Sequence, residues 1–289
     1  MLFCSSLYGQ QLPLTESYFV NRYALSSAYA GNSENESLFA SYRMDWSGIS
    51  DAPRTIRLSY HDGFKSNAGL GGKVAMDKFG IFQRFFVMGT YTYRLRLFKE
   101  GDQFLFFGLS AGLNQNSIKF DEYYNDPKFT NDPSMINKRR NSNLTLISDF
   151  STMYTYQKLQ IGLLLSNIGI SDSRYSGVRT VYSPFMHYQL HAIHTLSLGE
   201  DWQFSPLAVL RGGKNVKAQL EVASQFKYHN KLWGSIAHRG KNVSCVGFGL
   251  DMSKGILLNY TYNFFTGVSV SAFQNHELTL GLNIGEFIR

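Results

Sequence analysis

The sequence predicts an all-β protein, namely a transmembrane antiparallel β-barrel of about fourteen strands of the outer-membrane type. Three observations support this prediction. Apolar and polar residues alternate with period 2 along the chain, aromatic residues make up 15% of it, and no apolar stretch reaches the roughly 18 residues of a transmembrane helix. A barrel turns only alternate residues to lipid, so a mean hydropathy of −0.20 is compatible with membrane embedding.

The first residues are expected to lie outside the barrel. The opening string MLFCSSLYGQQ resembles the end of a secretory signal peptide without its basic start, so residues 1–10 are assigned to a signal remnant. The turn-rich residues 11–36 are expected to form an N-terminal periplasmic segment, and 37–289 a single barrel domain. The two cysteines, Cys4 and Cys245, give no disulfide framework.

The candidate strands follow one another without a linker or a second domain. The alternation is clear in 54–61, where Ile56, Leu58 and Tyr60 share one face and Arg57 lies on the other. The strands are predicted at 37–46, 54–61, 67–77, 82–98, 102–115, 141–156, 159–170, 184–197, 202–211, 216–228, 231–239, 242–252, 255–265 and 274–287.

The odd-numbered and even-numbered connections between these strands differ in length. Every second connection, starting from the second, is mostly tight. The other set contains the long ones, at 47–53, 116–140, 171–183 and 266–273. Outer-membrane barrels have short periplasmic turns and long extracellular loops, whereas a water-soluble sandwich has no reason to sort its loops in this way. The sequence therefore predicts that both termini lie on the periplasmic side.

The polar faces of the predicted strands carry charged residues in mid-strand. Such charges are costly in a dry core and are tolerated in a lumen that is wet or internally paired. The residues expected to line the lumen are Arg43, Arg57, Arg94, Arg96, Asp149, Lys217 and Glu221.

The histidines do not predict a metal site. His187 and His191 share the polar face of one strand and His194 does not, so a metal would need further ligands from other strands. The chain also lacks a nucleophile elbow. We therefore expect no catalytic residue, no bound metal and no cofactor.

Two further features have ordinary explanations. The string GLGGK at Gly69–Lys73 lacks the spacing of a phosphate-binding loop and predicts a strand with a close backbone approach. The net charge is +7, but the one dense basic cluster, Lys138–Arg140, lies in a polar stretch. Neither feature favours a nucleic-acid partner.

Several strings carry a family resemblance. They are SSAYAG at Ser26–Gly31, YRMDWSGI at Tyr42–Ile49, APRT at Ala52–Thr55, GLGG at Gly69–Gly72, DKFG at Asp77–Gly80, YTYRL at Tyr91–Leu95 and DPKF at Asp126–Phe129. Together they resemble the PorP/SprF family, outer-membrane components of the type IX secretion and gliding machinery of Bacteroidota. Where the family usually has Asn-Pro, this chain has Ser26-Ser27. The match is dense over about the first 130 residues and architectural beyond them.

The resemblance implies a non-enzymatic, integral outer-membrane barrel. Such proteins dock or retain a secreted surface protein, often through that partner's C-terminal domain, or link the machinery to the envelope. The implied partners are this secreted protein, other type IX components and outer-membrane lipid. The residues expected to contact the partner are of types favoured at interface hot spots, and are Trp46, Tyr123, Tyr124, Phe129, Arg139, Arg140 and Tyr175.

Alternatives remain open at this point. The main one is a porin-like solute channel with a basic lumen that favours anions. A lipid-modifying enzyme is weaker, because it needs a His or Ser constellation that the chain lacks. For the string around Trp46, a purely architectural role is as well supported as docking, with Gly48 and Pro53 shaping the turn and Trp46 at the membrane interface.

Overall fold

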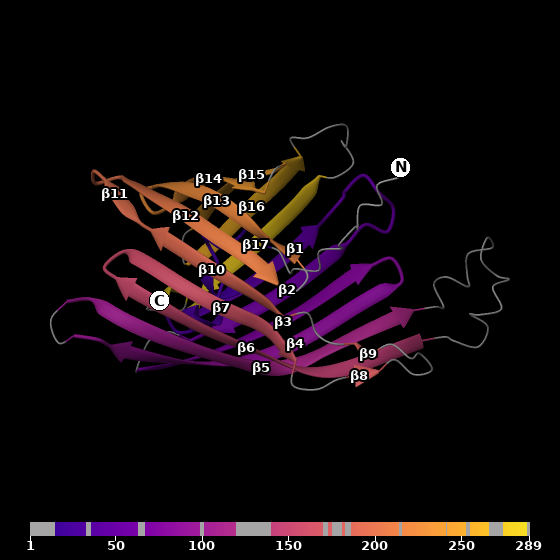
Figure 1. The fold of residues 1–289 in the computed structure, drawn as a ribbon. Coiled ribbons are helices and arrows are strands. Elements are labelled where there is room, and N and C mark those ends of the chain that lie inside the picture. Colours follow the sequence, from indigo (N-terminus) through magenta and orange to yellow (C-terminus); the bar gives the residue numbers. More distant parts are fainter. Residues whose placement is uncertain are drawn as a thin grey trace, which may run out of the picture.

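The computed structural model describes residues 15–32, 36–62, 67–98, 101–119, 140–169, 173–174, 181–182, 186–213, 216–240, 242–252, 255–265 and 274–287. These residues form an antiparallel β-barrel that encloses its own N-terminal segment (Figure 1). None of the helices in these ranges is long and apolar enough to cross a bilayer.

The barrel wall has fourteen strand positions. In the first half the strands are β1 (Ser37–Met44), β2 (Arg54–His61), β3 (Ala68–Phe79), β4 (Phe82–Arg96), β5 (Gln103–Lys119), β6 (Arg140–Tyr156) and β7 (Leu159–Gly169). In the second half they are β10 (His187–His194) with β11 (Leu196–Leu198), β12 (Trp202–Gly213), β13 (Val216–Tyr228), β14 (Leu232–Arg239), β15 (Val243–Met252), β16 (Ile256–Phe265) and β17 (Asn275–Asn283). β10 and β11 share one position because both pair with β12.

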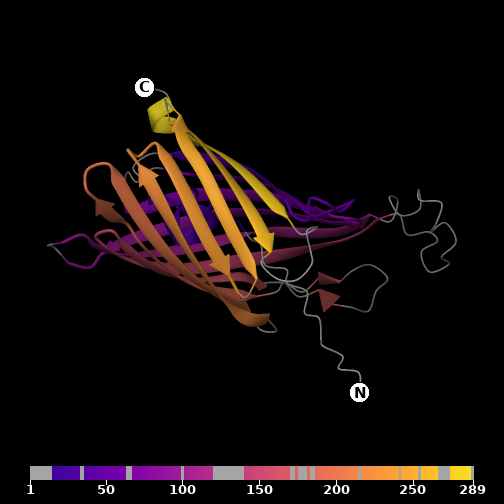
Figure 2. The ribbon, with the colours of Figure 1, turned by 90° about the horizontal axis from the view of Figure 1, so that it is seen from above.

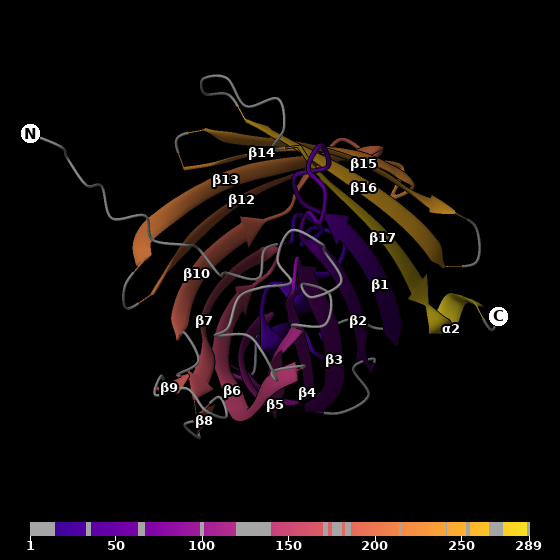
Figure 3. The same cartoon turned by 90° about the vertical axis from the view of Figure 1, so that its right-hand side faces the viewer.

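Each strand pairs with its neighbours in the chain, and two further pairings complete the ring. β1 pairs with β17 along its whole length, from Ser37 opposite Asn283 to Met44 opposite His276. β10 pairs with β7 on one side and with β12 on the other. The strands therefore surround a continuous interior, which Figure 3 shows in a view along the barrel. The predicted fold class is confirmed.

The two ends of the barrel differ as the loop parity predicted. One end, which we call the long-loop end, carries the long connections 45–53, 120–139, 170–186 and 266–274. Three shorter connections, at 80–81, 214–215 and 240–242, lie at the same end. The short-turn end carries 157–158, 199–201, 229–231 and 253–255, together with two six-residue connections at 62–67 and 97–102. The short helix α2 (Ile284–Phe287) follows β17 and packs against Gly255 at the short-turn end, where Figure 2 shows it in yellow.

The structure differs from the expected strands mainly at the long-loop end. β5 continues to Lys119 and β6 begins at Arg140, so the expected loop 116–140 is shorter than predicted. The region of the expected loop 171–183 contains a separate two-stranded pair, β8 (Ser173–Arg174) and β9 (Val181–Tyr182).

The two faces of the wall are separated as the alternation predicted. Ile56 and Leu58 of β2 are 44% and 48% exposed and face outward, whereas Ser59 is buried inside. Leu280 of β17 is 49% exposed, and its neighbour Thr279 only 1%. The outer surface is therefore a lipid-facing apolar band, and the hydrophobic core lies inside the ring.

The N-terminal segment is placed differently from the expectation. Residues 15–32 lie inside the barrel as a plug, rather than outside it as part of a periplasmic segment 11–36. Their side chains contribute much of the buried core, including Tyr18, Tyr23, Leu25 and Tyr29. Figure 3 shows this segment in indigo within the ring of strands.

Candidate functional site: the plugged lumen

The plug is shaped by two short 3₁₀ turns, η1 (Arg22–Ala24) and η2 (Ser27–Tyr29). The side chain of Asn21 caps the first by accepting a hydrogen bond from the Ala24 amide at 3.2 Å. The Ser26 hydroxyl accepts one from the Ala28 amide at 3.4 Å. Asn and Ser are favoured at such caps because their short side chains reach the free amides of the next turn. The string at Ser26–Gly31 therefore folds compactly within the lumen.

Glycines on the inner wall let the plug backbone approach closely. A Cβ atom at Gly69 of β3 would lie 2.6 Å from the Ala30 carbonyl oxygen, and one at Gly71 would lie 2.8 Å from the Tyr23 ring. A Cβ atom at Gly108 of β5 would lie 2.7 Å from the Ala28 amide nitrogen. The GLGG string is thus a strand with a close backbone approach, and the approaching backbone is that of the plug.

A chain of hydroxyl groups joins the middle of the plug to β4 and β5. The Tyr23 hydroxyl donates to Thr90 Oγ1 at 2.6 Å, and Thr90 lies 2.7 Å from Ser110 Oγ. Ser110 donates to Ser27 Oγ at 2.8 Å, and Thr92 donates to the Ser27 carbonyl oxygen at 3.1 Å. All these side chains except Tyr23 are small, so the plug lies directly against the wall.

The start of the plug is bound by an ion network near the long-loop end. The Glu16 carboxylate pairs with Arg239 of β14, lies 3.5 Å from Arg43 of β1 and accepts a hydrogen bond from Asn263 at 2.8 Å. The Glu277 carboxylate of β17 lies 3.4 Å from Arg43 and accepts from the Glu16 amide at 2.9 Å. These acidic and basic side chains are buried, so each depends on the others for charge compensation.

The network continues along the inner wall to β12 and β13. Glu221 accepts from Arg211 at 2.7 Å, lies 3.0 Å from Arg239 Nε and accepts from the Tyr18 hydroxyl. The guanidinium groups of this network are those of Arg43, Arg211 and Arg239, and the carboxylates around them are those of Glu16, Glu221, Glu277 and Asp45, the last of which lies 2.8 Å from Arg43. Glu16 is the carboxylate that the plug adds to this network, and it ties the plug to Arg43 and Arg239 of the wall.

The residues expected to line the lumen lie in different surroundings. Arg43 and Glu221 belong to the ion network, and Asp149 accepts from Ser166 Oγ at 2.7 Å. Arg57 points into the interior, where it lines a cavity between the plug and the wall. The remaining three lie nearer the barrel ends. The guanidinium groups of Arg94 and Arg96 lie 5.0 Å and 5.1 Å from the centre of the Phe104 ring, and Lys217 is exposed.

The residues expected to contact a partner are largely outside the described part of the chain. This holds for Tyr123, Tyr124, Phe129, Arg139 and Tyr175, and the side chain of Arg140 is likewise not described. Trp46 is described and lies in the β1–β2 connection. Its backbone amide donates to Asn275 Oδ1 at 3.1 Å, and its ring packs edge-on against Phe79 at 5.7 Å.

The histidines of β10 face different environments. His191 is buried next to the Tyr29 ring, with ring centres 5.6 Å apart, and His187 is also buried. His194 is exposed on the other face. Among the described residues, no three His, Cys, Asp or Glu side chains are grouped as a metal site would require.

Reasoning from the sequence missed the plug residues Glu16, Tyr18 and Tyr23 and their partners Arg239 and Glu277. The signal that could have indicated them is the inner-face glycines of β3 and β5. A glycine in a strand interior often marks the approach of another backbone.

Comparisons with known proteins agree with this architecture. Over residues 7–282 the chain matches the family described as type IX secretion system membrane protein PorP/SprF. The comparison with curated proteins gave no match. Among solved structures, the toluene transporter TbuX of Ralstonia pickettii aligns with a TM-score of 0.51 and 7% identity, over 89% of this chain and 90% of that chain. The deltaS2S3 mutant of the monoaromatic hydrocarbon channel TodX aligns with a TM-score of 0.50 and 10% identity, over 93% and 94%. At such low identity, these likenesses show the barrel fold alone.

Proposed function

The chain belongs to the type IX secretion system membrane protein family PorP/SprF and is an integral outer-membrane β-barrel, and from this premise we propose that it docks or retains a secreted surface protein. In this proposal the protein is not an enzyme. Its contact surface is the long-loop end, which faces the cell exterior in outer-membrane barrels. Other components of the secretion system are its further partners.

The observation that supports this proposal most is the occupied lumen. The plug hydrogen-bonds to β2, β4, β5, β10, β13, β16 and β17, and so is held on several sides of the ring. The alternative, a channel whose basic lumen favours anions, needs a continuous path lined by available positive charges. Here Arg43 is paired with Glu16 and Glu277, so it is not available to attract a passing anion.

In this proposal the partner contacts the connections at the long-loop end. A protein interface depends on a few aromatic or Arg anchors within a broad surface. Residues 120–139 and 175–180 include Tyr123, Tyr124, Phe129, Arg139 and Tyr175, which provide such anchors. Trp46 has a different role in this proposal. Its contacts with Asn275 and Phe79 make it a support for the rim rather than an anchor.

The test replaces Tyr123, Tyr124 and Phe129 together by Ser. We expect normal barrel abundance, because residues in connections contribute little to strand pairing, and release of the retained surface protein into the medium. A matched control replaces the exposed turn residues His229 and Lys231 at the short-turn end by Ser, and should leave retention unchanged.

Mass spectrometry of proteins that co-purify with the barrel from native outer membrane identifies the partner. Retention of every surface protein by the triple variant, at normal barrel abundance, would remove these three anchors from the proposal. Steady single-channel conductance of the purified wild-type protein would instead favour the channel alternative.

A further inference from the structure

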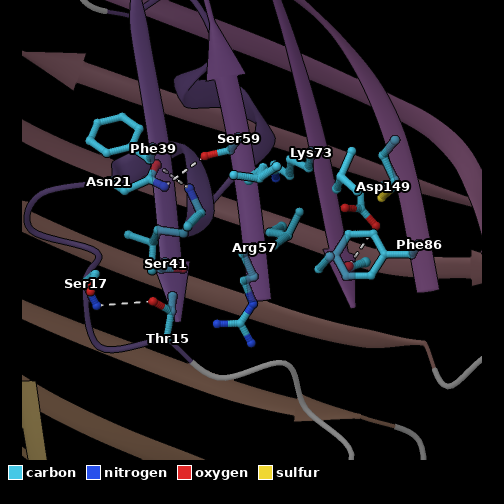
Figure 4. A pocket seen from close by; sticks show the side chains of 18 of the residues that line it. Thr15, Ser17, Asn21, Phe39, Ser41, Arg57, Ser59, Lys73, Phe86 and Asp149 are labelled. Atoms are coloured by element: carbon cyan, nitrogen blue, oxygen red, sulfur yellow. Dashed lines mark hydrogen bonds between the residues drawn. The ribbon is translucent and has the colours of Figure 1, made fainter. Parts of the chain in front are cut away.

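A cavity of about 110 Å³ lies between the plug and the inner wall. The plug contributes Ser17, Asn21 and Leu25 to its lining, and the wall contributes residues of β1 to β4, β6, β7, β10 and β17. Figure 4 shows Asn21, Phe39, Arg57, Lys73 and Asp149 among the side chains around it. Neither the docking proposal nor the ion network accounts for this space.

The cavity wall carries more positive than negative charge. Three cationic side chains line it, those of Arg57, Lys73 and Arg84, against the one carboxylate of Asp149. That carboxylate is already engaged, because its Oδ1 atom accepts from Ser166 Oγ at 2.7 Å and from the Asn167 amide at 2.9 Å. The cavity is therefore electrostatically suited to an anion.

Arg57 has donor capacity that the described residues do not use. Its Nη1 atom is buried and has no hydrogen-bond partner among them. A buried donor without a partner is costly, so such a group in a native structure indicates a missing acceptor. A guanidinium group presents parallel N–H donors in a planar fork that matches a carboxylate. Figure 4 shows the Arg57 guanidinium at one end of the group of drawn side chains, away from Lys73.

The other two cations add charge without closing the site. The Lys73 ammonium group lies 4.3 Å from the centre of the Tyr23 ring of the plug. Arg84 Nε donates to Asn114 Oδ1 at 2.7 Å, and its guanidinium lies 5.4 Å from the Phe86 ring. Both are thus fixed by neighbours while still contributing positive potential to the cavity.

The remaining wall is substantially apolar. Leu25, Phe39, Phe86, Ile147 and Leu164 all line the cavity. Such walls favour a ligand with an apolar body over a fully hydrated ion such as phosphate, because an ion would lose its water without replacement contacts. We propose that this cavity binds a small carboxylate with an apolar body, and that the Arg57 guanidinium is the anchor for the carboxylate group.

The test uses benzoate as the probe and benzamide as its uncharged counterpart of similar size. Titration calorimetry on the full-length protein in detergent should show saturable benzoate binding. Because a hydrogen bond to a charged group contributes more than one to a neutral group, benzamide should bind about tenfold or more weakly. Arg57→Gln should weaken benzoate binding by a similar factor. Arg54→Gln, on the same strand but exposed, is the matched control and should bind as wild type does.

Three outcomes would overturn the inference. They are no saturable binding of benzoate by the wild-type protein, equal affinities for benzoate and benzamide, and unchanged benzoate affinity in Arg57→Gln. If inorganic phosphate bound as tightly as benzoate, the part of the inference that requires an apolar body in the ligand would be wrong. None of these results bears on retention of the surface protein, so this inference and the docking proposal can fail separately.

Discussion

Replacement of Gly108 by Ala should loosen the plug without opening the barrel wall. The added Cβ atom would lie 2.7 Å from both the Ala28 amide nitrogen and the Ser27 carbonyl carbon, and 2.6 Å from Ser151 Oγ. The Ser151 hydroxyl can rotate away, but the plug backbone is held by the bond from Ser110 to Ser27. The plug must therefore move to relieve the contact.

The size of the effect follows from the cost of overpacking. An extra methyl group in a packed interior costs about 1–3 kcal/mol. This cost applies only while the plug is bound to the wall. The fraction of molecules with a released plug should therefore rise by about 5- to 150-fold. Hydrogen exchange measured by mass spectrometry on peptides from residues 15–32 reports this population, because amides such as Leu25 and Ala30 are hydrogen-bonded within the plug. Their exchange should accelerate by that factor.

The matched control is Gly89→Ala on the adjacent strand β4. A Cβ atom at Gly89 has nothing within 4 Å, and alanine weakens a strand less than glycine does. Exchange in the plug and in the wall should be unchanged in this variant. Unchanged plug exchange in Gly108→Ala, or equal acceleration in both variants, would refute the idea that the close approach at Gly108 holds the plug.

Three further predictions concern the lipid face, the ion network and the orientation. Leu280→Arg should destabilise the barrel by about 2–4 kcal/mol in a refolding titration in vesicles, if Leu280 lies at the membrane midplane. Thr279→Arg, which alternation alone predicts to be mild, should instead displace the plug, because Thr279 is 1% exposed and contacts it directly. Glu16→Gln should weaken plug binding by about 1–3 kcal/mol, measured as faster plug exchange, because both of its Arg partners keep another carboxylate. A cysteine at Asn131 should be labelled by an impermeant reagent in intact cells, and one at Gly101 should not.

Each of these has a contradicting result. Equal refolding free energies for Leu280→Arg and wild type would mean that the outer face is misassigned. Slow, wild-type exchange of the plug in Thr279→Arg or Glu16→Gln would mean that the contacts seen at these two positions do not hold it. Labelling at Gly101 rather than at Asn131 would invert the orientation.

The barrel wall could be predicted from the sequence because its pattern is local. β2 spans Arg54–His61, as the alternation predicts, since every second residue meets lipid. The predicted strand ends were wrong at the long-loop end, where contact with lipid no longer imposes the alternation of apolar and polar residues. β5 continues beyond its predicted end at residue 115 through Asn116–Lys119, a polar stretch that was predicted to be part of a loop. Hydrogen bonding to β6 keeps this stretch extended, and that pairing cannot be read from residues 116–119 alone.

The plug could not be predicted from the same kind of pattern. It has no long period, and its contacts join residues far apart in sequence, such as Thr15 and Glu277, 262 positions apart. Its polar residues therefore resemble a solvated segment. The charges of Arg43 and Glu221 were expected in a wet or paired lumen. Their pairing with a segment that precedes β1, through Glu16 and Tyr18, becomes visible only in the structure.

The position of the plug has a consequence for biogenesis. Residues 15–32 leave the ribosome before the barrel strands do, yet Glu16 and Ser17 have partners on β16 and β17, more than 240 residues further along the chain. β17 also supplies the partner of β1, so the barrel cannot close before residues 275–283 have been made. Until then the edge of β1 has no β17 to pair with, and the plug segment lacks its partners on β16 and β17. A chain that stalls before β16 leaves Glu16 without Asn263 and the Glu16 amide without Glu277, and quality-control proteases would meet its N-terminal residues unprotected.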